Sequence, residues 1–146
     1  AESVCRRMRE QGVKCSVVKF HARNNKLVTE SAQKKLPFPT DITKEIADTA
    51  LELFCKNFNL DTPIRSIGVA VSSFSSAADA MQYDFFTDAE KKVKLERLDK
   101  TIDTLKNRYG NYTIQRASLL KDTSLSHFNP YGDHNIHPVG VLKTKI

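Results

Sequence analysis

The feature that most constrains this chain is the run Ile-Arg-Ser-Ile-Gly-Val-Ala-Val-Ser-Ser-Phe at residues 64–74. Within it, Ile67, Val69 and Val71 alternate with small residues, which are Ser66, Gly68, Ala70 and Ser72. A period of two is that of a β-strand, whose side chains point alternately to the two faces of a sheet. The run therefore predicts a strand with one core face and one face almost free of side-chain bulk.

The segment before this strand predicts a helix and two strands. Apolar residues at helical spacing predict a helix over 2–11, which Gly12 ends. The β-branched run at 13–22 predicts a strand, and a more polar strand is expected to return over 26–36. The Pro-Phe-Pro sequence at 37–39 is expected to close off that second strand.

A second helix is predicted over 42–57, with Asp41 as its N-cap. Its apolar residues recur every three or four positions and form one broad stripe, which comprises Ile42, Ile46, Ala50, Leu53, Phe54 and Phe58. The resulting order is helix–strand–strand–helix–strand. This order predicts an α+β plait that lacks a first strand, in which the helices pack on one face of the sheet.

Charge is distributed unevenly along the chain. Residues 1–40 carry nine Lys or Arg against three Asp or Glu, residues 41–88 three against eight, and residues 89–146 eleven against six. A basic first third is typical of a surface that faces phosphates, although cytosolic proteins also often have uneven charge. The charge alone therefore leaves nucleic-acid binding and plain surface solvation both open.

The polar face of the predicted sheet supplies the candidate binding residues. Cations bind phosphates, and small residues let backbone N–H groups approach them. The candidates for a DNA-binding face are Lys14, Ser16, Lys19, Lys34, Lys35, Arg65, Ser66, Gly68 and Ser72, with Ser73 beside them.

Three segments resemble successive landmarks of the little-finger domain of bacterial Y-family translesion DNA polymerases, of the DNA polymerase IV and UV-damage repair type. They are Gly-Val-Lys-Cys-Ser-Val at 12–17, Lys-Leu-Pro-Phe-Pro-Thr-Asp-Ile-Thr at 35–43 and Pro-Ile-Arg-Ser-Ile-Gly-Val-Ala-Val-Ser at 63–72. The resemblance covers residues 1 to about 86. A weaker likeness continues through 98–110 and 114–119.

The resemblance implies a sheet that lies along the DNA major groove and holds the phosphate backbones of a damaged duplex without reading its sequence. Lys34, Lys35 and Arg65 match basic positions of the family, whereas Val18, Phe20 and Ala70 stand where many relatives have polar or basic residues. Such a polymerase uses paired carboxylates that hold two Mg²⁺ ions. This chain offers no such set, so we expect it to contain neither a catalytic residue nor a cofactor. We expect its parent protein to be the DNA-directed DNA polymerase.

A short apolar motif follows a linker of small residues at 75–81. It consists of Gln82, Tyr83, Asp84, Phe85 and Phe86, and it resembles the peptide with which bacterial proteins bind the sliding clamp. In a peptide-in-groove complex, the glutamine amide occupies a polar subsite while the last two apolar side chains fill a hydrophobic pocket. The alternative is that the aromatic residues pack on their own domain as an edge strand.

The remaining third predicts a helix over 88–108, which Gly110 ends, followed by a tail that is loop-like from Lys121. We therefore expect a little-finger-like domain at 1–76, a linker with the clamp peptide at 77–88, and a helical extension at 89–146. The role of this extension is left open.

Other constellations favour ordinary interpretations. Cys5, Cys15 and Cys55 are expected to be reduced, buried cysteines of a cytosolic protein. The cluster of His127, Asp133, His134 and His137 favours a polar loop over a metal site. No apolar stretch is long enough to span a membrane, and we expect a cytoplasmic protein of the SOS response.

Two further functions compete with DNA holding. An independent RNA-binding sheet would display stacking aromatic residues on its open face, for which Phe20 and Phe38 are the candidates. A dimerisation module could instead use the helix at 89–109, although its apolar stripe spans fewer than three heptads.

Overall fold

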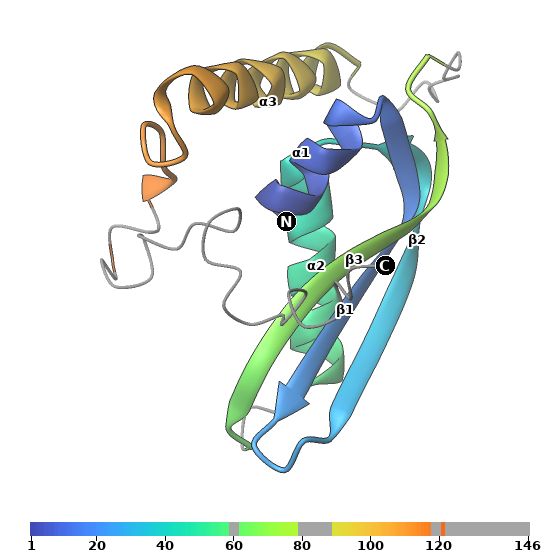
Figure 1. Cartoon of the computed structure of the whole chain (residues 1–146). Coiled ribbons are helices and arrows are strands. Elements are labelled where there is room, and N and C mark those ends of the chain that lie inside the picture. The colour runs from blue at the N-terminus through green and yellow to red at the C-terminus, as the bar shows by residue number, and fades with distance from the viewer. Residues whose placement is uncertain (59–61, 79–88, 118–120, 122–146) are drawn as a thin grey trace, which may run out of the picture. The chain divides into compact units, whose positions relative to one another are not determined.

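The computed structural model describes residues 1–58, 62–78, 89–117 and 121. It divides into two units, Ala1–Lys100 and Thr101–Ile146. Figure 1 shows the helices and strands in the order α1 (Glu2–Glu10), β1 (Val13–Asn24), β2 (Thr29–Thr40), α2 (Thr43–Asn57), β3 (Ile64–Ser76) and α3 (Ala89–Tyr109).

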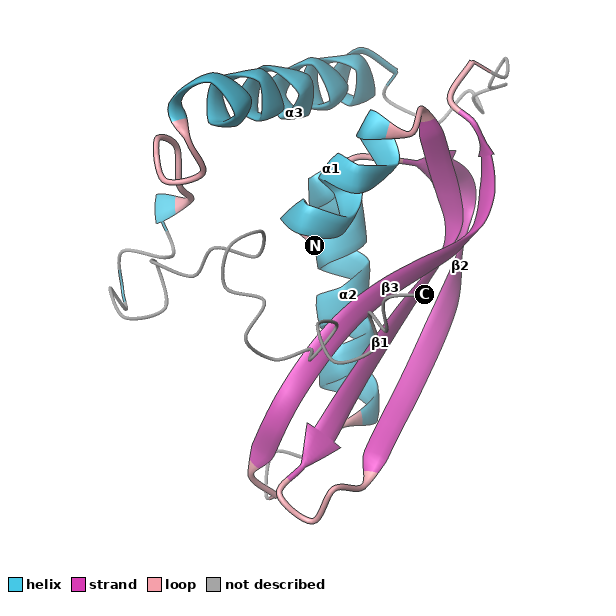
Figure 2. Cartoon of the chain, in the orientation of Figure 1, coloured by secondary structure: helices cyan, strands magenta, loops and turns pink. Residues whose placement is uncertain are grey.

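The three strands form one antiparallel sheet in the order β2-β1-β3, so β1 is the central strand. Helices α1 and α2 lie on the same side of this sheet (Figure 2). The predicted α+β arrangement, with helices on one face, is therefore confirmed for the described residues. Gly12 and Gly110 follow α1 and α3 with positive φ angles of 64° and 95°, which confirms both predicted helix stops.

Alternation along β1 separates the two faces of the sheet. Val18, Phe20 and Ala22 are buried and point toward the helices. Their partners across the β3 ladder are Val71, Val69 and Ile67. The predicted core face of the third strand is thus correct for Val69 and Val71, which pack against the core, whereas Ile67 at the end of that face is 66% exposed.

Helix α2 supplies the other half of the core through the predicted stripe. Ile46, Ala50 and Leu53 are buried against β1. Phe54 and Phe58 close the lower part of the core, where their ring centroids lie 5.4 and 5.2 Å from the ring centroid of Phe20. Burial of such aromatic and branched side chains contributes about 1.5–3 kcal/mol each.

The second strand is longer than predicted, because it continues through both prolines to Thr40. A proline lacks the N–H that a central strand needs, but β2 is an edge strand of the described sheet. The ladder also shifts here: Val17 pairs with Lys35 and Cys15 pairs with Thr40. The prolines therefore lie in a bulged stretch of an edge, where the missing N–H groups cost little.

The predicted N-cap of α2 is also wrong. The cap position is Ile42 and it makes no side-chain cap bond, while Asp41 is buried with its Oδ1 unpaired. Asp99 of α3 takes over the function of a cap: its Oδ2 accepts the backbone N–H of Thr43 at 2.7 Å. The Arg9 Nη1 lies 3.4 Å from the same oxygen and also donates to the Asp41 carbonyl at 2.7 Å. A carboxylate distant in sequence thus satisfies a helix N-terminus.

All three cysteines are free thiols, of which Cys5 and Cys15 are buried. Burial raises the pKa of the Cys5 thiol to about 11 and that of the Cys15 thiol to about 12. Cys55 is exposed on α2, so the expectation that all three are buried is wrong for this residue. No helix among the described residues combines the length and the apolar character needed to cross a membrane.

Replacing Asp99 tests the contact that joins α3 to α2. We expect Asp99→Ala to lower the free energy of unfolding by about 2 kcal/mol, because a helix cap is lost and Arg9 loses its carboxylate partner while it keeps the Asp41 carbonyl. Asp99→Asn keeps an acceptor for Thr43 and should cost about half as much. Urea unfolding measures both effects. Asp48→Ala, at an exposed α2 position, is the control and should change stability by less than about 0.5 kcal/mol; an equal loss in Asp99→Ala and the control contradicts the capping role.

Candidate nucleic-acid interface

The face of the sheet opposite α2 is the candidate interface, and we call it the open face. Its positions on β1 are Val17, Lys19, His21 and Arg23, which alternate with the buried residues. The residues that pair with them across the two ladders are Thr29, Ser31, Gln33 and Lys35 of β2 and Ser66, Gly68, Ala70 and Ser72 of β3.

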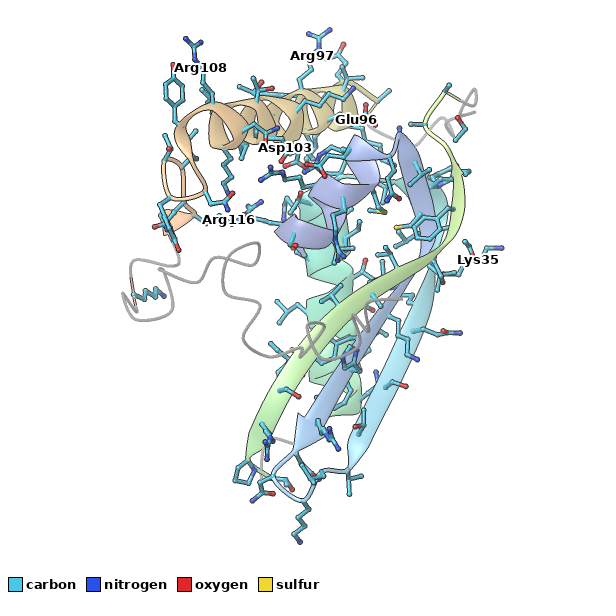
Figure 3. The ribbon with its side chains drawn as sticks, in the orientation of Figure 1. Lys35, Glu96, Arg97, Asp103, Arg108 and Arg116 are labelled. Atoms are coloured by element: carbon cyan, nitrogen blue, oxygen red, sulfur yellow. The ribbon has the colours of Figure 1, made fainter. Side chains whose placement is uncertain are left out.

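The open face is basic in its paired stretch. Lys19 and Arg23 from β1 and Lys35 from β2 are exposed, and no Asp or Glu occupies any of the paired open-face positions described above. In Figure 3 the Lys35 side chain extends away from the sheet on the side opposite α2. Because none of these paired positions carries a carboxylate, the attraction of the cations for an anion is not compensated at these positions.

The side chains on the β3 part of the open face protrude little from the sheet, because its residues are small. Gly68 pairs with His21, and a Cβ at Gly68 would collide with the His21 imidazole ring. The imidazole therefore lies over the backbone of Gly68, in space that any other residue would occupy. This packing places His21 beside the cations of β1 on the same face.

The prediction that Lys34 faces outward is wrong. Lys34 pairs with the buried Val18 and thus belongs to the helix-covered face. Its Nζ lies 2.6 Å from the Glu52 carboxylate of α2. The hydrogen bond from Lys34, together with a smaller effect of the hydrogen bond from Lys56, lowers the pKa of the Glu52 carboxyl to about 2. Such an exposed pair adds little stability, but it shows which way the lysine points.

Lys14 was also predicted to face outward, and this is wrong as well. Its side chain is only 12% exposed and its Nζ lies 2.8 Å from the Glu96 carboxylate of α3. Asp41 lies close enough for the charge of Lys14 to influence its pKa. Lys14 is therefore already neutralised by carboxylates and is not part of the open face.

The other predicted residues divide into two groups. Ser66, Gly68 and Ser72 lie on the open face through their pairing with β1. Arg65 and Ser16 lie in stretches where a ladder shifts register, Arg65 between the pairs of Arg23 and Asn24. Arg65 is exposed and Ser16 is half-buried, and alternation assigns neither of them to a face.

Sequence reasoning missed His21 and Arg23. Both follow Lys19 at steps of two along β1, so the period of a strand could have identified them once Val18 and Phe20 were assigned to the core. The adjacent valines at 17 and 18 left the register of this strand ambiguous in the sequence.

Aromatic residues do not line the open face. Phe20 is 6% exposed and packs in the core, while Phe38 lies beneath Lys92, whose Nζ is 5.2 Å from the ring centroid. The paired open-face positions contain no Phe, Tyr or Trp. The stacking surface expected of an RNA-binding sheet is therefore absent from this part of the structure.

Two predicted sites lie outside the described residues. These are the clamp peptide at 82–86 and the histidine cluster at 127–137. Among the residues that are described, no group of three or more His, Cys, Asp or Glu is arranged to hold a metal ion.

The sequence of residues 1–85 matches the family described as the impB/mucB/samB family C-terminal domain. The chain belongs to this family. The match covers the entire sheet and its two helices, and the predicted resemblance to the C-terminal domain of Y-family translesion polymerases is thereby confirmed.

Several relatives carry the name DNA polymerase IV. That of Acetivibrio thermocellus is 35% identical over 86% of this chain, that of Treponema denticola 31% over 83%, and that of Clostridium acetobutylicum 30% over 82%. These matches cover 32%, 30% and 30% of the respective relatives. The chain thus spans about a third of the length of these polymerases.

The buried Asp41 carboxyl, which lies near Lys14, provides a test of how burial of a charge affects stability. Burial raises the pKa of Asp41 above its ordinary value of 3.8, and the nearby Lys14 opposes this only in part. An acid with a raised pKa in the folded state costs stability as pH rises from about 4 through its folded pKa, because the unfolded chain ionises first. We therefore expect Asp41→Asn to be more stable than the wild type at pH 7 and no more stable at pH 3.

Urea unfolding at the two pH values measures this effect. Asp48→Asn, an exposed carboxyl on α2, is the control and should show no gain at either pH. A less stable Asp41→Asn variant at pH 7 would show that the charged form of Asp41 stabilises the fold.

Proposed function

We propose that the open face binds the phosphate backbones of duplex DNA without sequence preference, as the DNA-holding domain of a translesion polymerase. The observation that carries this proposal is the charge of the two faces. Acids and their lysine partners lie on the helix-covered side, as at Lys34 and Glu52, while Lys19, Arg23 and Lys35 stand on an open face without carboxylates at its paired positions. The names of the relatives support the assignment to DNA.

The chemistry of the open face favours backbone contacts over base recognition. Cations and small residues suit phosphates, whereas readout of single strands uses aromatic platforms. In the described sheet β3 is an edge strand, so half of its backbone N–H groups point away from β1. The small residues Ser66 and Ser72 leave these groups accessible to a phosphate oxygen, whereas at Gly68 the His21 imidazole covers the backbone.

The two competing functions have less support. An RNA-binding sheet lacks its aromatic residues, since Phe20 is in the core. A dimerisation module could use the exposed Leu98 and Tyr109 of α3. Sedimentation across a concentration series, with and without DNA, distinguishes that function from DNA holding.

We further propose that residues 82–86 tether the parent polymerase to the sliding clamp. The support is the motif itself and its position in the chain, between β3 and α3 and next to a DNA-binding domain. Burial of Phe85 and Phe86 in a clamp pocket supplies about 4–6 kcal/mol before ordering costs. This energy suits a tether that exchanges readily. The catalytic carboxylates, and the Mg²⁺ that they hold, would belong to other parts of the parent enzyme.

Neighbouring lysines on opposite faces provide a matched test of DNA binding. We expect Lys35→Ala to weaken binding to a 20-base-pair duplex of arbitrary sequence, and to reduce the slope of log affinity against log salt by about 0.9 for one lost phosphate contact. Lys34→Ala removes the same charge from the helix-covered face and should leave the slope unchanged. Fluorescence anisotropy in a salt series measures both variants. Equal effects of the two variants would contradict the assignment of the faces.

The tether is tested separately. Phe85→Ala/Phe86→Ala should abolish binding to a bacterial sliding clamp in calorimetry, because the pocket anchors are removed, and should leave DNA affinity unchanged. Gln82→Ala should weaken clamp binding less. Clamp affinity that survives the double substitution rules out this motif as the tether.

A further inference from the structure

The turn that joins β1 to β2 exposes two adjacent apolar side chains. Leu27 is 51% exposed and Val28 is 54% exposed. They belong to residues 25–28, which connect the two strands and which we call the tip loop. Figure 1 shows this turn at the end of the sheet opposite to α1. Single exposed apolar residues are common on protein surfaces, so the exposure alone assigns no role to the tip loop.

The backbone of Leu27 has a conformation that disfavours leucine. Its φ angle is 66°, in the left-handed region, where the Cβ of an L-residue crowds the following carbonyl oxygen. Asparagine and glycine adopt this conformation much more readily, and asparagines stand nearby at positions 24 and 25. Residues held in such conformations cluster at binding sites. Leu27 thus exposes an apolar side chain at a local conformational cost.

Hydrogen bonds hold the tip loop in one shape. The Asn24 Oδ1 accepts the Val28 N–H at 3.0 Å, and the Asn24 carbonyl accepts the Leu27 N–H at 3.1 Å. The Asn25 N–H donates to the Pro63 carbonyl at 3.1 Å, which joins the loop to the residue before β3. A loop that is already ordered loses little conformational entropy when a partner binds.

The polar residues around the apolar pair fit a nucleic acid. Arg23 belongs to the open face, and its Nε donates to the Leu27 carbonyl at 3.2 Å, so the tip loop is continuous with that face. Lys26 is exposed, and the segment 23–29 contains no Asp or Glu. Proteins that bind the minor groove of DNA combine arginine, lysine and asparagine with an apolar side chain such as leucine.

We propose that the tip loop enters the minor groove of duplex DNA, where Leu27 and Val28 contact the apolar carbons of the deoxyribose rings. The inference rests on the proposed function, because it takes duplex DNA as the partner. It adds an apolar contact to a surface that otherwise holds DNA through cations. Contacts with the sugars carry no sequence information, so they keep the binding independent of sequence.

The salt dependence of binding distinguishes this apolar contact from a phosphate contact. Each phosphate contact releases counterions and makes affinity fall more steeply with salt, whereas an apolar contact releases none. Loss of the apolar side chains should therefore weaken DNA binding equally at every salt concentration. Loss of Lys35 should instead change the slope.

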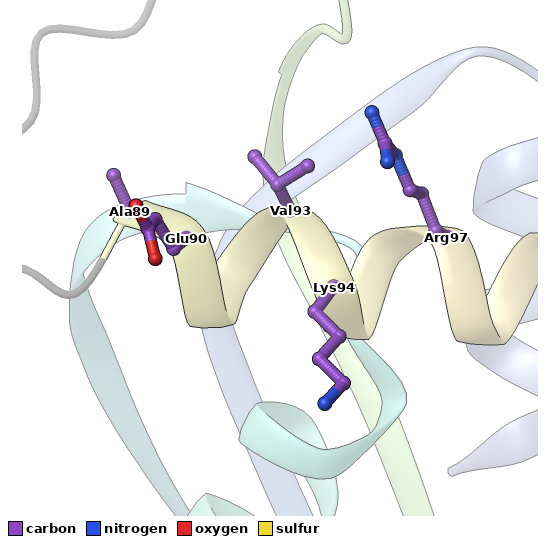
Figure 4. A pocket seen from close by; sticks show the side chains of 5 residues that line it. All are labelled: Ala89, Glu90, Val93, Lys94 and Arg97. Carbon is purple, nitrogen blue, oxygen red and sulfur yellow. The ribbon is translucent and has the colours of Figure 1, made fainter.

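The test compares two double variants of the full chain that each truncate one leucine and one valine. Leu27→Ala/Val28→Ala is the tip variant. Leu51→Ala/Val93→Ala is the matched control, because both of its residues are exposed, Leu51 on α2 and Val93 among charged side chains on α3 (Figure 4). In fluorescence anisotropy with a 20-base-pair duplex, we expect the tip variant to bind several-fold more weakly with an unchanged salt slope. The control should bind like the wild type.

A third variant separates the DNA contact from the shape of the loop. Asparagine adopts the left-handed conformation more readily than leucine, so Leu27→Asn should be at least as stable as the wild type in urea unfolding. It should nevertheless bind the duplex several-fold more weakly. A Leu27→Asn variant that is less stable but binds DNA normally would show that the leucine serves the fold, and would overturn the inference.

The choice of groove is tested with an A·T-rich duplex and netropsin, a small molecule that fills the minor groove. Netropsin should reduce the difference in affinity between the wild type and the tip variant, because the groove is no longer open to the loop. A difference that netropsin leaves unchanged would contradict the assignment to the minor groove.

The outcomes separate this inference from the proposed function. If Lys35→Ala changes the salt slope and the tip variant binds like its control, the inference is overturned while the function proposed for the open face stands. If the tip variant binds more weakly while Lys35→Ala has no effect, the tip loop contacts DNA and the function proposed for the open face fails. If neither variant differs from its control, both proposals are overturned.

Discussion

The register of β1 between its two neighbours is the constraint on which the rest of the structure depends. Val18, Phe20 and Ala22 must face α2 to form the core, and their burial contributes several kcal/mol in total. A slip of one residue would bring Lys19 and Arg23 into the core and expose the Phe20 ring. The hydrophobic core therefore decides which side chains stand on the open face. The charge pattern of that face is a consequence of packing on the other side of the same strand.

Much of this arrangement follows from local sequence patterns. The alternation of Ile67, Val69 and Val71 predicts the two faces of β3, and Gly12 and Gly110 predict the helix ends, because strand period and positive φ are local properties. The apolar stripe of α2 is predicted for the same reason. These features needed no knowledge of which segments meet in space.

The errors concern features that depend on long-range contacts. Lys34 and Lys35 are equivalent in the sequence, and only the pairing of β2 with β1 assigns them to opposite faces. Asp41 stands at an ordinary N-cap position, but Asp99, distant in sequence, takes the Thr43 N–H instead. Lys14 is basic and lies on a strand, but Glu96 of α3 neutralises it. A cation is a candidate for phosphate binding only when its partners are known.

The most direct test of the central claim maps DNA onto the two faces of the sheet. The measurement is a titration of the ¹⁵N-labelled chain with duplex DNA, followed through amide chemical shifts. The account predicts that the largest shifts occur at Lys19, His21 and Arg23 of β1 and at residues 66–72 of β3, while α2 changes little. Large shifts confined to α2, with β1 and β3 unaffected, would contradict it.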